Sequence, residues 1–231
     1  MNVENMNSPD NPGDTASGNY VITIGRQFGS GGREFGRLLA QELGIAYYDK
    51  ELLIEAARKA GMGQEFFERN DERTPSFLSG LMWFTHSVKP SPLYMDQGSY
   101  MSDDSLYRAM AEMIADIASR GPCVIVGRTA DYVLRDQPNV FNIFIHASEE
   151  ECVNRIMKRG DVENHKKALD KLRRTNKLRA AFYNFYTDKH WGNADSYDIS
   201  INSALFPMPQ WVKFVADIVR QRFNITNTPH T

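Results

Sequence analysis

The sequence predicts an α/β protein, a three-layer α/β/α sandwich with a mostly parallel central sheet. Short β-branched runs alternate with amphipathic helical segments along most of the 231 residues, and this alternation is typical of open parallel sheets with helices on both faces. The first run, Tyr20 to Ile24, is continuous, as in a strand that is covered on both faces. A glycine-rich turn, Gly25 to Gly32, connects this strand to the first helix.

The expected elements follow in order. Apolar residues at helical spacing, from Phe35 to Leu43, predict a helix that Gly44 ends. Ser148 precedes three glutamates, a pattern that caps and charges a helix N-terminus. Further strands are expected at 45–48, 123–126, 140–146 and 197–201, and further helices at about 50–60, 105–119, 129–135 and 208–223.

One domain accounts for most of the chain. Residues 1–18 have little to bury and are expected to be a disordered leader, 19–225 form the domain, and 226–231 are a tail. Within the domain, 61–101 fits no regular element and is interpreted as an insertion. We find no signal peptide and no apolar run long enough to span a membrane, so a cytoplasmic protein is expected.

The net charge of −2 hides an asymmetry. From Arg155 to Lys189 there are 11 Lys and Arg against 4 Asp and Glu, a net charge of +7, so the remainder carries −9. Nucleic-acid binding is not expected, since the acidic remainder of the chain would repel the phosphate backbone of a nucleic acid. Cys123 and Cys152 are interpreted as buried thiols, and the five histidines have no metal-ligand spacing, so no metal site is predicted.

The glycine-rich turn lies where a phosphate-binding loop belongs, between the first strand and the first helix. Backbone N–H groups gather at such a helix N-terminus, and glycines let a phosphate approach closely; the alternative is a merely tight turn. In the motif G-x-x-x-x-G-K-[ST] a lysine reaches the phosphates and a hydroxyl binds Mg²⁺. Gly32 and Arg33 stand at those two places, so Arg33 or Arg26 would supply the charge, unless Arg26 is a surface ion-pair partner.

Three blocks of the sequence, 22–53, 123–136 and 177–203, together resemble the cytidylate kinase-like family, relatives of the nucleoside monophosphate kinases. The resemblance covers about 20–223. It implies the P-loop NTPase fold, with an NMP-binding insertion at 61–101 and a helical lid at about 155–192. It also implies ATP-dependent phosphorylation of CMP or dCMP, with ATP and Mg²⁺ as cofactors and small nucleotides as the only partners.

The resemblance also implies roles for single residues. The segment that matches the ATP phosphate loop is Gly29, Ser30, Gly31, Gly32, Arg33 and Glu34. Asp49 and Arg128 match residues that bind the acceptor nucleotide in true cytidylate kinases, whereas Glu55 and Thr129 depart from the acceptor blocks of those enzymes. The match to the lid arginines falls on Lys177 and Arg179, with Arg173 and Arg174 before them. Arg33, Arg26, Arg179 and Lys177 are therefore the candidate catalytic cations.

Purely structural roles also remain open for these residues. Arg128 could pair with Asp131 or Asp136, Asp49 could cap the helix after it, and the basic segment could be a solvated helix face. The aromatic residues Phe182, Tyr183, Phe185, Tyr186 and Trp191 are expected to pack rather than stack on a base. Two other functions also remain, a P-loop kinase for another small acceptor and a nucleotide-binding protein without catalysis. The sequence leaves the oligomeric state open.

Overall fold

The computed structural model describes residues 18–49 and 103–225. Its centre is a five-stranded sheet in the order β2-β3-β1-β4-β5, in which every neighbouring pair is parallel. The strands are β1 (Val21–Arg26), β2 (Ala46–Tyr48), β3 (Cys123–Val126), β4 (Val140–His146) and β5 (Ile199–Asn202). The predicted α/β sandwich with its parallel sheet is confirmed.

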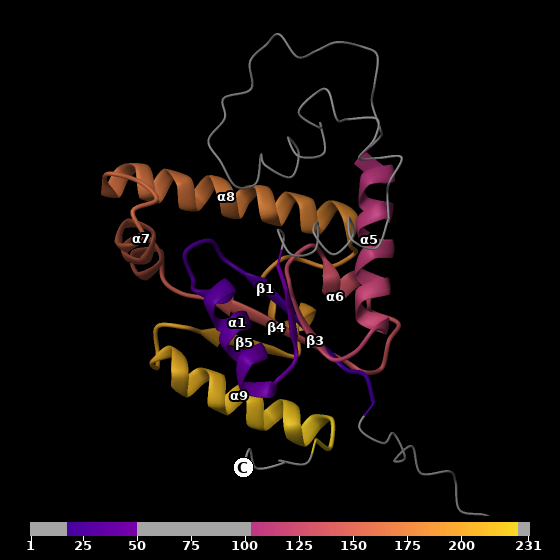
Figure 1. Ribbon diagram of the computed structural model, residues 1–231. Helices are drawn as coiled ribbons and strands as arrows, with labels where there is room; N and C mark the ends of the chain where they lie inside the picture. Colours follow the sequence, from indigo (N-terminus) through magenta and orange to yellow (C-terminus); the bar gives the residue numbers. More distant parts are fainter. Residues whose placement is uncertain (1–17, 50–102, 226–231) are drawn as a thin grey trace, which may run out of the picture.

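Helices cover both faces of this sheet (Figure 1). The helices α1 and α9 lie on one face, α5 and α6 lie on the other, and α8 crosses the top of the view, beyond the ends of the strands. Their bounds are α1 (Gly32–Leu43), α5 (Asp103–Ser119), α6 (Ala130–Val133), α7 (Glu149–Lys158), α8 (His165–Tyr186) and α9 (Met208–Arg222), with a 3-10 turn at Ala194–Ser196. The expected leader, the helix at 50–60, the insertion and the tail lie outside the described residues.

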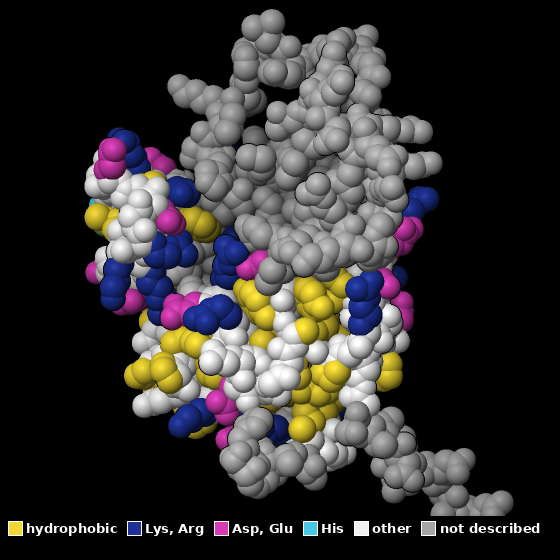
Figure 2. All heavy atoms as spheres, viewed as in Figure 1, with side chains coloured by type: hydrophobic (Ala, Val, Ile, Leu, Met, Phe, Trp, Pro, Cys, Tyr) yellow, Lys and Arg dark blue, Asp and Glu magenta, His cyan; other side chains and the backbone are white. Residues whose placement is uncertain are grey.

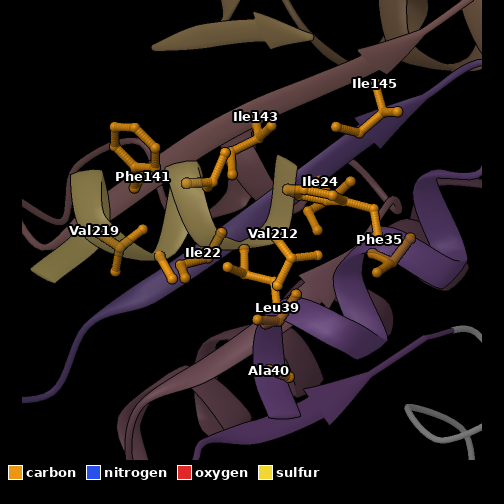
Figure 3. Packing of buried hydrophobic residues seen from close by; sticks show 14 of the residues in the cluster. Ile22, Ile24, Phe35, Leu39, Ala40, Phe141, Ile143, Ile145, Val212 and Val219 are labelled. Atoms are coloured by element: carbon orange, nitrogen blue, oxygen red, sulfur yellow. The ribbon is translucent and has the colours of Figure 1, made fainter. Parts of the chain in front are cut away.

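The core on one face is built by alternate residues of the central strands. Ile22 and Ile24 of β1 pack with Phe35 of α1 and Val212 of α9, and all four side chains are buried (Figure 3). Because side chains alternate along a strand, their neighbours point to the opposite face. There Val21 packs with buried residues of α5 and α6. Burial on both faces explains the continuous β-branched run.

Both cysteines are free and buried, as predicted. Burial raises the pKa of the Cys123 thiol to about 12 and that of Cys152 to about 11. Neither thiol forms its reactive thiolate readily at neutral pH. In the part of the chain that the structure describes, no helix is both long and apolar enough to cross a lipid bilayer.

Several element boundaries differ from the sequence prediction. The helix expected at 129–135 spans only Ala130–Val133: Arg128 and Thr129 before it adopt left-handed φ values of 66° and 53°, and it ends two residues earlier than expected. The last strand begins at Ile199, two residues later than expected, after the 3-10 turn at Ala194–Ser196 and the bend that follows it. Within the basic segment, α7 ends at Lys158, and α8 starts where Asn164 Oδ1 accepts the N–H of Lys167 at 2.9 Å.

Replacing Ile143 with alanine is expected to lower the free energy of unfolding by about 2–5 kcal/mol, because a fully buried side chain is removed from the core. Chemical denaturation monitored by circular dichroism measures the change. Ile218→Ala is the matched control, since Ile218 is 40% exposed on α9. Equal losses in the two variants would contradict the assignment of the core.

Candidate active site

A large hollow opens at the carboxyl ends of β1 and β3. The glycine loop (residues 25–32), the turn after β3 and one side of α8 line it. Ligands of open parallel sheets bind outside the carboxyl ends of the strands, where the connections on the two faces diverge. The topology therefore places the predicted loop and the predicted acceptor arginine, Arg128, around one space.

Positive charge dominates this hollow. Four acids, Glu34, Asp49, Asp131 and Asp161, line it together with nine cations. The cations are Arg26, Arg33, Arg37, Arg128, Arg155, Lys158, Arg159, Lys171 and Arg179. Figure 2 shows Lys and Arg side chains gathered on the left of the view, over α7 and the adjacent end of α8. Such a lining is suited to a ligand with several negative charges.

The glycine loop turns sharply from β1 into α1. Gly29 and Gly31 have φ values of 77° and 84°, and a Cβ atom on Gly29 would lie 2.7 Å from the carbonyl oxygen of Cys152. Helix α1 then starts at Gly32, and no side chain caps it. The first-turn N–H groups of a helix have no intrahelical partner and carry partial positive charge. Gly31 and Gly32 line the hollow at this helix end.

Ser30 holds the loop together from inside. Its side chain is fully buried, and its hydroxyl donates to the carbonyl oxygen of Gln27 at 2.9 Å. The carbonyl oxygen of Ser30 accepts from Arg155 Nη1 at 2.8 Å and from Ser203 Oγ at 2.6 Å. Ser30 does not line the hollow, so its hydroxyl serves the loop's shape.

Arg33 and Asp49 form an ion pair across the entrance of α1. Arg33 Nε and Nη2 each lie 2.7 Å from Asp49 Oδ2, and the Tyr47 hydroxyl donates to the same oxygen at 3.3 Å. The Arg33 side chain is 64% exposed, whereas that of Asp49 is 7% exposed. Burial, and next the charge of Asp49, raise the pKa of Tyr47 to about 12. The ion pair ties the first turn of α1 to the end of β2.

Arg26 crosses the floor of the hollow. A Cβ atom on Gly32 would lie 2.6 Å from Arg26 Cβ, and one on Gly127 would lie 1.9 Å from Arg26 Nη1. The side chain therefore runs past the start of α1 and places its guanidinium against the turn after β3. Both neighbouring positions must be glycine for this path to be open.

Arg128 stands on a strained turn. Three consecutive residues, Gly127, Arg128 and Thr129, have left-handed φ values of 79°, 66° and 53°. This conformation costs a non-glycine residue about 1–3 kcal/mol and often occurs at functional sites. The turn directs the chain from β3 into α6 and keeps Arg128 at the hollow.

A carboxylate that the sequence reasoning did not include among the site residues lies in the hollow. Asp131 is 6% exposed, and the Tyr183 hydroxyl donates to its Oδ2 at 2.6 Å. Burial raises the pKa of Asp131. Asp131 and Asp136 were the two acids considered as ion-pair partners of Arg128. Asp136 Oδ2 lies 3.7 Å from Nη2 of a different arginine, Arg135. The contact of Asp131 with Tyr183 joins residues 52 positions apart, so no local sequence pattern indicates it.

Helix α8 is attached directly to the glycine loop. Asn176 Oδ1 accepts the backbone N–H of Phe28 at 2.7 Å, and Arg179 Nη1 donates to the carbonyl oxygen of Arg26 at 2.9 Å. Arg159, Lys171 and Arg179 lie 5.5–5.7 Å from the centre of the Phe28 ring. Burial, followed by the charges of Arg26 and Arg128, lowers the pKa of Arg179 well below its ordinary value.

Only one of the four predicted lid cations lines the hollow, and that is Arg179. Arg173 binds Glu149 on the surface through two hydrogen bonds of 2.9 and 2.7 Å, and Arg174 and Lys177 are exposed. Arg174 and Lys177 therefore lie outside the lining of the hollow. Residues 171, 175 and 179 share the inner face of α8 at i, i+4 and i+8, so Lys171 accompanies Arg179.

The predicted aromatic run divides between these faces. Phe182, Tyr183 and Trp191 line the hollow. Tyr186 stacks on Tyr107 with ring centres 4.2 Å apart, and Phe185 is 76% exposed. Packing accounts for Tyr186, whereas Phe185 contributes little to the core.

The model of the cytidylate kinase-like family matches residues 21–205. The chain belongs to the cytidylate kinase-like family. This match includes the glycine loop, the turn after β3 and α8. Membership of the family supports a nucleotide-binding P-loop kinase, and such kinases in general use ATP and Mg²⁺.

Several solved structures are similar to this family member. An uncharacterized protein from Eubacterium ventriosum ATCC 27560 is 26% identical, with a TM-score of 0.61 over 90% of this chain and 99% of that chain. A gluconokinase from Sinorhizobium meliloti 1021 is 14% identical, and a shikimate kinase from Acinetobacter baumannii in complex with shikimate is 15% identical. Their TM-scores are 0.49 and 0.47, each over 90% of this chain and 96% of the other. No curated protein sequence matches this cytidylate kinase-like chain.

The described residues of this family member show no metal centre built from protein side chains. Within 18–49 and 103–225, no three His, Cys, Asp or Glu side chains come together in a way that could hold an ion. Arg33 occupies the place of the motif's Ser or Thr, and the Ser30 hydroxyl is turned into the loop. A magnesium ion would therefore enter as part of its nucleotide complex, bound by phosphate oxygens and water.

Replacing Asn176 with alanine is expected to increase hydrogen exchange at the Phe28 amide by about 2- to 10-fold, because one hydrogen bond between the glycine loop and α8 is lost. Exchange measured by NMR or mass spectrometry gives the rate. Asn184→Ala is the matched control, since Asn184 Oδ1 accepts the N–H of Trp191 at 2.9 Å. It should affect Trp191 and leave Phe28 unchanged; an unchanged Phe28 rate in Asn176→Ala would contradict the attachment of α8.

Proposed function

We propose that the chain transfers the γ-phosphoryl group of MgATP to a nucleoside monophosphate, CMP or dCMP. The observation that carries the proposal is the strongly cationic hollow between the glycine loop and Arg128. Phosphoryl transfer needs mainly positioning and positive charge around the moving group. The loop and the N-terminus of α1 are suited to the ATP phosphates, and Arg128 is suited to the acceptor phosphate.

The size of the hollow supports two ligands rather than one. Its volume is about 1360 Å³, compared with about 300–1000 Å³ for a site that takes one small ligand. In the reaction, an anionic oxygen of the acceptor phosphate forms a bond to the γ-phosphorus. The bond from that phosphorus to the bridging oxygen breaks, and ADP leaves with the electron pair. Because the attacking oxygen is already anionic, this step needs no proton acceptor.

Arg179 and Lys171 would act at the phosphoryl group itself. They reach the hollow from α8, which is attached to the loop at Phe28, and a closed lid excludes water that would compete as acceptor. Arg173, Arg174 and Lys177 would act further out, because they are exposed. We place the reaction in the cytoplasm, where ATP and mononucleotides occur together.

A second candidate acceptor is a small hydroxylated metabolite. The buried Asp131, hydrogen-bonded to Tyr183, favours it, because a carboxylate with a raised pKa can orient a hydroxyl group and accept its proton. A screen for ADP release from MgATP, over all ribo- and deoxyribonucleoside monophosphates and a set of hydroxylated metabolites, separates the two acceptors. Tight ATP binding without transfer to any of them would indicate a nucleotide-binding protein without catalysis.

Replacing Arg128 with glutamine is expected to lower kcat/KM for the monophosphate by about 100-fold or more, through loss of a charged hydrogen-bond donor to phosphate. Glutamine is no more strained than arginine at a φ of 66°, so the fold should be kept. The affinity for MgATP, measured by calorimetry, should change less than about 3-fold. Arg135→Gln, on the surface beside Asp136, is the control. Full turnover by Arg128→Gln would rule out this role.

A further inference from the structure

The glycine loop contains a cation at a place where the general motif has none. In G-x-x-x-x-G-K-[ST], the lysine comes six positions after the first glycine. Because Gly32 stands at the lysine position, the first glycine position is occupied by Arg26. The chain therefore has a cation where the motif has glycine, and glycine where the motif has a cation.

The structure gives a steric reason for this exchange. A Cβ atom on Gly32 would lie 2.6 Å from Arg26 Cβ and 3.1 Å from Arg26 Cγ. Carbon atoms that are not bonded prefer separations of about 3.5–4.0 Å, and neither atom is the end of a flexible side chain. Positions 26 and 32 thus cannot both carry a side chain in this loop, and whichever one carries it supplies the cation.

The guanidinium of Arg26 reaches the centre of the site. A Cβ atom on Gly127 would lie 1.9 Å from Arg26 Nη1 and 2.7 Å from Arg26 Cζ, so this group lies against the turn that holds Arg128. The carbonyl of Arg26 accepts from Arg179 at 2.9 Å. Arg26 therefore lies between the loop, the acceptor turn and the lid helix, and it lines the hollow.

We propose that Arg26 replaces the P-loop lysine, with Gly32 and Gly127 opening the path for its side chain. The inference rests on the proposed phosphoryl transfer and names the residue that serves it. Arg33, the other candidate, is held by Asp49 at 2.7 Å and is mostly exposed. A guanidinium binds two phosphate oxygens with a planar pair of N–H groups, whereas an ammonium acts as a point charge.

The test is a reciprocal exchange of the two positions. Arg26→Gly should lower kcat/KM by at least about 100-fold, since a charge aimed at the transition state is lost. Gly32→Lys alone should also lose activity, because its Cβ meets Arg26. The double variant restores the first glycine and the lysine of the general motif, although Arg33 still stands at the Ser/Thr position, and it should recover at least 10-fold over Arg26→Gly. A gain by the pair that neither single change provides is the signature of coupling.

Binding and folding controls keep the outcomes distinct. MgATP affinity is measured by calorimetry and folding by thermal unfolding, with Arg135→Gly as a matched surface control. Arg26→Met keeps the stem without the charge and serves if Arg26→Gly unfolds. If the wild type turns over and Arg26→Met turns over nearly as fast, the role of Arg26 is overturned while the proposed function stands. The role of Arg26 is also overturned if Gly32→Lys is as active as the double variant. A wild type that neither binds MgATP nor transfers phosphate overturns the proposed function with it.

Discussion

The close contact between the end of β1 and the start of α1 is the constraint on which the rest of the site depends. The space at this contact holds one side chain. Arg26 fills it, so position 32 is a glycine, which has no side chain to clash with it. The same path requires Gly127 in the turn after β3. The start of α1 and the distant turn after β3 are thus both shaped around the side chain of Arg26, which extends from the end of β1.

The contact of α8 with the loop follows from this arrangement. Asn176 and Arg179 bind the backbone of residues 28 and 26, so α8 contacts the main-chain atoms of the loop. Such contacts depend on the loop's conformation more than on its side chains. The buried Ser30, bound to Gln27, Arg155 and Ser203, maintains that conformation from the other side. The glycine loop is therefore held by hydrogen bonds from both α8 and α7.

Local sequence patterns predicted the strands and helices well, because the formation of these elements depends largely on residues that are close in the sequence. The strands at 123–126 and 140–146 and the helix after Ser148 have their expected positions. The left-handed Arg128 and Thr129 shorten the helix after them, and no pattern in the sequence indicates those angles. Nor does a local pattern indicate which face of α8 lines the hollow. Charge alone does not distinguish Lys171, which lines the hollow, from Arg173, which binds Glu149 on the surface.

The Lys and Arg residues of the basic segment, 155–189, divide into a group on the surface and a group that lines the hollow. Two of its surface members, Lys167 and Arg173, form exposed ion pairs with Glu163 and Glu149, and such pairs contribute little to stability. Its inner members line the hollow together with Arg26 and Arg128. Burial, and next the charges of Arg26 and Arg128, lower the pKa of Arg179 and so oppose its positive charge. Like charges held together raise the free energy of the site until an anion enters, and each added phosphate relieves more of that repulsion. The hollow is thereby suited to polyphosphates, and the acidic remainder of the chain keeps the net charge at −2.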